Sequence, residues 1–193
     1  MTPPFTPEAL HQLLRQYYPA GLLVDEPGYK DSEQARRLTQ LLNEAEQDMS
    51  AWKAFVQRVR QELPGCGFWD TTLLFLEPCY SLRVLLPETV NNKNRSDAVV
   101  CLLSVLAPVY AVYASHNDET GEDPETWVRF PPLPPAFQPY EERLARLIET
   151  TFGATRLPEE VLFFPIPELS PRTGNTLPGT DRIIDLLFMT HIW

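Results

Sequence analysis

The chain has 193 residues, of which 44% are hydrophobic and 22% are charged, and its formal net charge is −10 at pH 7. This composition is typical of a packed globular protein and excludes disordered, fibrous and membrane-spanning classes, so we expect a single domain over residues 1–193. The negative charge disfavours binding to nucleic acid or to anionic lipid and favours a basic protein partner. The N-terminus shows no secretory signal, and we therefore expect a cytoplasmic protein.

The N-terminal third of the chain predicts helices. Thr6 followed by Pro7 is a typical helix start, because the hydroxyl caps free N–H groups and proline needs no donor in the first turn. Asp31 with Gln34 has the form of a capping box, which predicts the start of a second helical stretch. Apolar residues then recur in steps of three and four. One face is expected to be buried, whether this stretch is one helix or two joined near Ser50.

The middle of the chain predicts an antiparallel sheet. Four short runs rich in β-branched, leucine and aromatic residues are separated by turn residues. They span residues 71–76, 81–86, 98–106 and 109–115. Close connections favour an antiparallel meander, because parallel strands need crossovers of about a dozen residues or more. We expect the helices to cover one face of this sheet.

The last third predicts one further helix between two loops. Residues 116–135, acidic at first and then rich in proline, are expected to form a loop, and residues 169–180 a second, exposed one. A helix is expected over residues 140–152, ended by Gly153 in a left-handed conformation. The apolar segment 182–193 packs either as a short helix or as a strand. The fold class is therefore α+β, with a meander of about four or more strands packed against N-terminal helices and one later helix.

The sequence contains no local motif of a familiar catalytic or nucleotide-binding type, such as a P-loop, a dinucleotide fingerprint or a nucleophile elbow. Cys66, Cys79 and Cys101 are widely spaced and odd in number, which disfavours a structural disulfide or a zinc site. Cys101 is expected in the core, and no histidine is placed near Cys66 or Cys79 to activate a thiol. We therefore expect no enzymatic activity, no cofactor and no metal.

An acidic segment without Lys or Arg follows the fourth predicted strand. With His116, its carboxylates could supply oxygen ligands to a divalent cation, but a solvated turn is the commoner role of such a run. Trp127 comes directly after it, where an aromatic side chain serves equally often in a domain core or at the centre of an interface. The candidate partner-binding residues are Asp118, Glu119, Glu122, Asp123, Glu125 and Trp127.

Three further segments carry a resemblance to a known family. They read WDTTLLFL at 69–76, LLSVLAPVYAVYAS at 102–115 and DLLFMTHIW at 185–193. With the helices between them they cover most of the chain from about Arg37 onward. The arrangement resembles the small immunity proteins that bacteria make against polymorphic toxins, including toxins delivered by type VI secretion or carried on Rhs-type proteins.

This resemblance implies a cytoplasmic protein that binds one cognate toxin domain tightly and blocks its active site or its assembly. It implies no catalytic residues, and no binding residues can be carried over from the family. Many toxin domains are basic because they attack nucleic acids or nucleotides, and opposite fields speed association with the right partner.

Two rival functions fit the same sequence. An adaptor or chaperone that escorts a secreted protein before export would also capture its partner stoichiometrically, but it would give no protection against a toxin. A small hydrolase would need two carboxylates brought together in a cleft with their pKa values pushed apart. A purely structural subunit has no fibrous, repeat or coiled-coil pattern in its favour.

Overall fold

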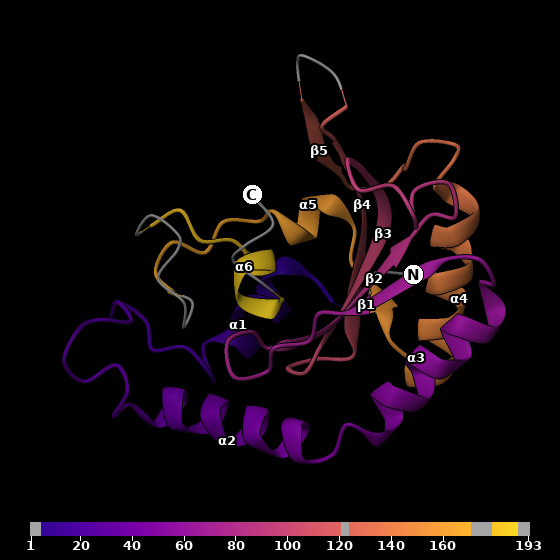
Figure 1. Cartoon of the computed structure of the whole chain (residues 1–193). Helices are drawn as coiled ribbons and strands as arrows, with labels where there is room; N and C mark the ends of the chain where they lie inside the picture. Colours follow the sequence, from indigo (N-terminus) through magenta and orange to yellow (C-terminus); the bar gives the residue numbers. More distant parts are fainter. Residues whose placement is uncertain (1–4, 121–123, 171–178, 189–193) are drawn as a thin grey trace.

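The structure is a computed structural model that describes residues 5–120, 124–170 and 179–188 (Figure 1). The helices within these residues are α1 (Pro7–Leu14), α2 (Glu33–Gln47), α3 (Ser50–Glu62), α4 (Gln138–Phe152), α5 (Glu159–Leu162) and α6 (Ile183–Leu187). The strands are β1 (Gly67–Asp70), β2 (Cys79–Leu85), β3 (Arg95–Ser104), β4 (Val109–Asp118), β5 (Glu125–Arg129) and β6 (Thr155–Arg156). The fold is α+β, as predicted. None of the described helices is long and apolar enough to cross a membrane.

The sheet is an antiparallel meander with one short parallel addition. Strands β1 to β5 lie side by side in chain order, and each is antiparallel to the next. Strand β6 runs parallel to the start of β4, where Thr155 lies opposite Val109. The predicted runs at 81–86, 98–106 and 109–115 correspond to β2, β3 and β4, so the meander is confirmed.

Two strands differ from the prediction. Strand β1 occupies residues 67–70 and not 71–76, because the Asp70 carboxylate accepts a hydrogen bond from the N–H of Thr72 at 3.1 Å and so turns the chain out of the strand. Strand β5 lies in the stretch predicted as a loop. Thr126, Trp127 and Val128 are strong strand formers, but the acidic residues before them and the prolines after them favoured the prediction of a loop.

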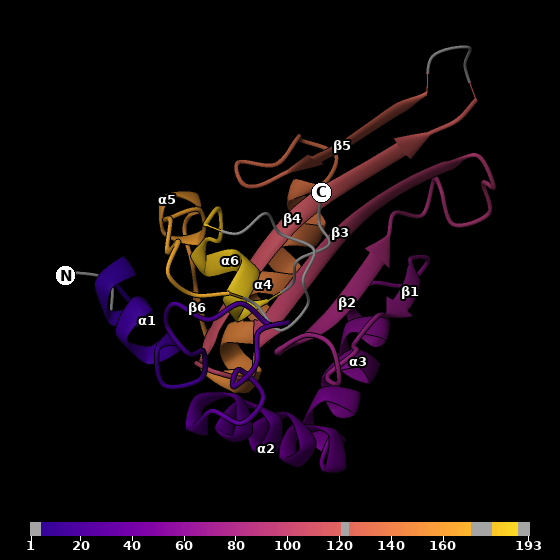
Figure 2. The ribbon, with the colours of Figure 1, turned by 90° about the vertical axis from the view of Figure 1, so that its left-hand side faces the viewer.

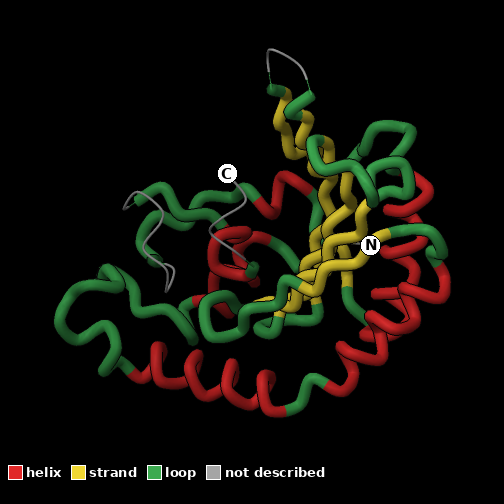
Figure 3. Tube along the Cα trace, in the orientation of Figure 1, coloured by secondary structure: helices red, strands yellow, loops and turns green. Residues whose placement is uncertain are grey.

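Helices cover both faces of the sheet, and the expectation of one covered face is wrong (Figures 1 and 3). Val99 and Cys101 of β3 pack against α3 and α4, whereas Val100 and Leu102 pack on the side of α1, α5 and α6. All four side chains are at most 3% exposed. A signal for this was present, since residues 98–103 are apolar without alternation, as is typical of strands buried on both sides.

The long helical stretch is two helices that serve different faces. It breaks after Gln47, and the Asp48 carboxylate accepts a hydrogen bond from the N–H of Ser50 at 3.1 Å. Leu38 of α2 belongs to the cluster under α1 and α6, whereas Trp52 of α3 belongs to the cluster under α4. The helix pair thus bends around one end of the sheet (Figure 1). The apolar residues of α2 pack in one core cluster and those of α3 in the other.

The predicted exposed loop over residues 169–180 is confirmed only in part, since Gly179 and Thr180 are exposed. Leu169 is fully buried and Ser170 is 8% exposed, while residues 171–178 lie outside the described part of the chain. The ambiguous segment forms helix α6 over residues 183–187, and residues 189–193 are not described. The pattern of apolar and polar residues could not distinguish a helix from a strand here, because nearly every residue of the segment is apolar.

Local capping signals predict two of three helix ends correctly. The Thr6 hydroxyl accepts a hydrogen bond from the N–H of Ala9 at 3.2 Å, as expected. The cap of α2 is Ser32 and not Asp31, because the Ser32 hydroxyl accepts from the N–H of Ala35 at 3.1 Å. Gly153 ends α4 at φ 62° in the left-handed region, which confirms the predicted C-terminal cap.

We expect Gly153→Ala to lower the free energy of unfolding by about 1 kcal/mol, because a side chain is strained at positive φ. No heavy atom lies within 4 Å of the added Cβ, so the loss arises from the backbone alone. Urea denaturation measures it. Gly153→Asn is the matched control and should lose less, since asparagine tolerates this conformation. Equal stability of the alanine variant and the parent would contradict the assignment.

Candidate functional site

Strands β4 and β5 form a hairpin that extends beyond the helical layers (Figures 1 and 2). Its register runs from Ala114 opposite Arg129 to Asp118 opposite Glu125. The hairpin carries the predicted partner-binding residues: Asp118 ends β4, Glu119 follows it, Glu125 begins β5 and Trp127 lies at its centre, while Glu122 and Asp123 fall outside the described residues.

The described carboxylates of the hairpin make no ion pair with any described residue. Asp118 accepts hydrogen bonds from the hydroxyl and the N–H of Thr120, which lower the pKa of its carboxyl group. Glu119 accepts from the side-chain amide of Asn117 at 3.1 Å, and Glu125 is exposed. Arg95 lies opposite Asp118 in the ladder, but its guanidinium binds another carboxylate. The negative charge of this end of the sheet is therefore available to a partner.

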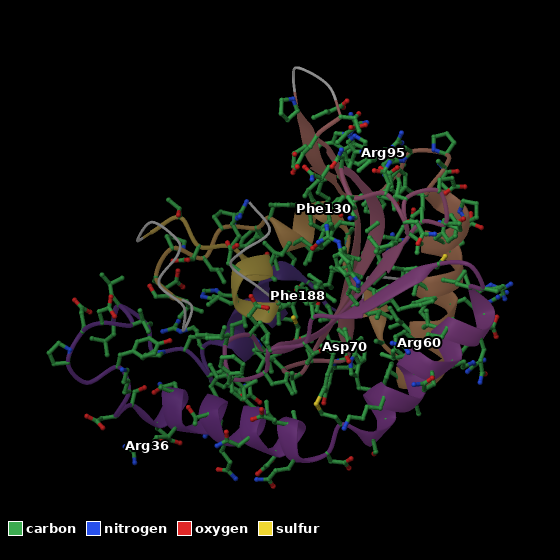
Figure 4. The ribbon with its side chains drawn as sticks, in the orientation of Figure 1. Arg36, Arg60, Asp70, Arg95, Phe130 and Phe188 are labelled. Carbon is green, nitrogen blue, oxygen red and sulfur yellow. The ribbon has the colours of Figure 1, made fainter. Side chains whose placement is uncertain are left out.

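At the base of the hairpin, three side chains from neighbouring strands form a row. Asp97, His116 and Trp127 lie opposite one another in β3, β4 and β5. Nδ1 of His116 is 2.5 Å from Oδ1 of Asp97, and the His116 ring stacks on Trp127 with centroids 5.1 Å apart. Arg95 donates two hydrogen bonds to Asp97, at 2.8 and 3.0 Å (Figure 4 labels Arg95).

This row fixes Trp127, whose role the sequence left open. Its side chain is half-buried, packs edge-on against Phe137 and carries the Arg129 guanidinium 4.9 Å from its ring. His116 was expected to begin the acidic loop, but it is a buried residue of β4. Sequence reasoning missed the row, because it depends on a ladder register that joins residues 19 positions apart.

An aspartate that orients a histidine is also the geometry of a catalytic base. Such a base serves a nucleophile within hydrogen-bond reach. In the described part of the chain, His116 makes no hydrogen bond to a serine, threonine or cysteine. Its Nδ1 contacts Asp97 and its ring stacks on Trp127. His11 is half-buried and contacts the Glu168 carboxylate, and His191 lies outside the described residues.

The described residues contain no group of three or more His, Cys, Asp or Glu side chains that could hold a metal ion. In particular, His116 lies against Asp97 at the base of the hairpin, whereas Asp118 binds Thr120 near its tip. The cation site considered for this segment is therefore not assembled by the part of it that the structure describes.

Burial suppresses the reactivity of all three thiols. It raises the pKa of Cys66 to about 11, with a further rise from the Glu88 carboxylate, and that of Cys101 to about 12. The pKa of Cys79 lies well above its ordinary range, chiefly because of burial and then because of Glu77. A thiol that stays protonated at neutral pH is a poor nucleophile.

A hollow of about 510 Å³ opens beside the base of the hairpin. It combines cationic and aromatic side chains from β5, α5 and the start of α6. Its lining residues are Val128, Arg129, Phe130, Glu159, Phe163 and Arg182. The sequence did not reveal it, because its walls come from segments that lie far apart in the chain.

Comparison of the chain with protein families, with curated proteins and with solved structures finds no match. Any assignment of function therefore rests on the geometry and the charge of the chain itself.

We expect Cys66 to react slowly with iodoacetamide in the folded protein. With a pKa of about 11 in place of 9.0, its thiolate fraction at pH 8 is lower by about 100-fold. Peptide mass mapping should show alkylation of Cys66 rising up to about pH 11, whereas the urea-unfolded chain should react with a midpoint near 9. Rapid alkylation at neutral pH would contradict this assignment and reopen a catalytic role.

Proposed function

We propose that the chain is an immunity protein that binds a cognate bacterial toxin domain stoichiometrically in the cytoplasm and thereby neutralises it. The observation that carries the proposal is the projecting β4–β5 hairpin, whose carboxylates at Asp118, Glu119 and Glu125 make no ion pair with any described residue. A surface of this kind favours a basic partner, because opposite fields accelerate encounter and reject wrong partners.

The base of the hairpin supplies aromatic and arginine side chains that can anchor a contact. Binding energy is concentrated where aromatic and arginine side chains anchor a contact and exclude water. Trp127 and Arg129 are stacked there, and the hollow beside them can receive a side chain of the partner. The Asp97–His116 pair holds this region in place before binding, which reduces the entropy lost on association.

Charge reversal at the hairpin tests the proposal. The variant carries Asp118→Ser, Glu119→Lys, Glu122→Lys and Asp123→Ser, with serine at 118 to retain a short polar turn residue. We expect its affinity for the toxin encoded beside it to fall by about 10- to 100-fold, chiefly through slower association. Co-purification, biosensor kinetics and growth rescue on co-expression with the toxin measure the effect.

The matched control makes the same changes at four exposed carboxylates away from the hairpin: Asp25→Ser, Glu46→Lys, Glu142→Lys and Glu160→Ser. Its net charge equals that of the test variant, so retained binding separates the local from the global field. Binding that survives the hairpin changes would refute the assigned surface. Export of a secreted protein that depends on the chain, without any rescue of growth, would favour the adaptor.

A second candidate, a small hydrolase, rests on the Asp97–His116 pair. The two functions differ in stoichiometry. In a purified assay we expect toxin inhibition to reach completion at one chain per toxin. His116→Gln should weaken binding, because it removes the contacts with Asp97 and Trp127, but it should keep this one-to-one endpoint. Inhibition at substoichiometric amounts that is lost in His116→Gln would support the hydrolase and contradict the first proposal.

A further inference from the structure

Exposed apolar side chains gather along the edge of the sheet opposite the hairpin. The exposed fraction is 55% for Trp69, 44% for Leu73 and 56% for Phe75. Trp69 lies in β1, and the other two lie in the turn that follows it. Within the described residues only Leu23, at 39%, is another exposed large apolar side chain. We call Trp69, Leu73 and Phe75 the edge patch.

The backbone of β1 is open on one side. Strand β1 pairs with β2, and no described residue pairs with its outer side (Figure 2). The N–H of Thr71 donates to the C=O of Ser81 at 2.9 Å, which sets the alternation of the ladder. Because bonded pairs alternate, Trp69 directs its N–H and C=O toward β2, whereas Phe68 and Asp70 direct theirs outward. The edge thus offers two residues to a further strand.

We propose that β1 pairs with β1 of a second copy of the chain, antiparallel and about a two-fold axis at Trp69. Phe68 of each copy then forms a hydrogen-bonded pair with Asp70 of the other, so every outward-facing group of both strands is used. The two Trp69 residues face each other with Cα atoms about 4.5 Å apart. If the axis passed through Phe68 instead, Asp70 would face residue 66 of the second copy, and if it passed through Asp70, Phe68 would face residue 72. Both of these residues lie outside β1, so neither register pairs the two strands fully.

Charge favours this register. The guanidinium of Arg60, in α3, lies 5.8 Å from the centre of the Phe68 ring (Figure 4 labels Arg60 and Asp70). Residues two apart in a strand project to the same face, so Phe68 and Asp70 both face α3. Pairing Phe68 with Asp70 of the second copy therefore brings each Arg60 toward a carboxylate. That carboxylate is held by a hydrogen bond from the indole N–H of Trp52 at 3.0 Å.

The two copies also meet at a segment that carries no net negative charge. A net charge of −10 on each chain opposes association, although salt screens it beyond about 8 Å at physiological ionic strength. Residues 49–76 contain three cations and two acids, a net charge of +1, so the rest of the chain holds −11. Pairing through β1 leaves the acidic hairpin, at the other edge of the sheet, outside the contact.

The mass of the purified full-length chain tests the pairing. Size-exclusion chromatography with light scattering should give twice the mass of one chain at high concentration, falling toward one chain on dilution. Trp69→Lys should give the mass of one chain throughout, because like charges then stand directly opposite each other. Its circular dichroism should be unchanged, since Trp69 is exposed. Leu23→Lys makes the same change outside the edge patch and should dimerise like the parent.

Cysteine cross-linking tests the register. Trp69→Cys in a Cys66→Ser background should form a disulfide-linked pair on mild oxidation, because facing residues lie within disulfide range. Leu23→Cys in the same background is the control and should stay unlinked. A parent chain that remains monomeric up to about 1 mM, or a dimer that survives Trp69→Lys, would overturn the proposal. Both experiments use the chain alone, so they do not depend on toxin binding.

Discussion

The burial of β3 and β4 on both faces is the constraint on which the rest of the structure depends. Each buried Val or Leu side chain contributes about 1.5 to 3 kcal/mol only while it is shielded from water, so both sides of the two strands need a cover. Helices α3 and α4 shield one side, and α1, α5 and α6 shield the other. The chain must therefore pass from one side to the other, and it does so at the break between α2 and α3 and again, through β6, between α4 and α5.

The same constraint explains where the hairpin becomes a surface. Strand β4 is apolar and buried through Ala114 and ends at Asp118, so its last residues leave the covered layers. The Asp97–His116 pair and Trp127 occupy the transition, where buried polar groups need partners and find them across the strands. The hairpin is consequently held at its base by contacts between neighbouring strands, whereas its charged residues lie beyond the covered layers.

Sequence reasoning succeeded where the physics is local. The Thr6 cap, the Gly153 cap and the three central strands follow from residues close together in the chain. It failed where the outcome depends on distant partners. The second covered face, strand β5 and the pairing of Asp97 with His116 depend on register and packing between segments far apart, which composition does not encode. For the candidate site, the acidic residues were visible and their supporting row was not.

The two edges of the sheet differ in a way that limits how large any assembly can grow. Strand β5 has charged Glu125 and Arg129 at its ends and is followed by prolines, which lack the donor that a ladder requires. Strand β1 has neither proline nor lysine. If only the β1 edge of each sheet can pair, the joined sheet of two copies has no further edge that accepts a third copy. Pairing of β1 strands between two copies would thus end in a closed pair, and an open fibre is avoided.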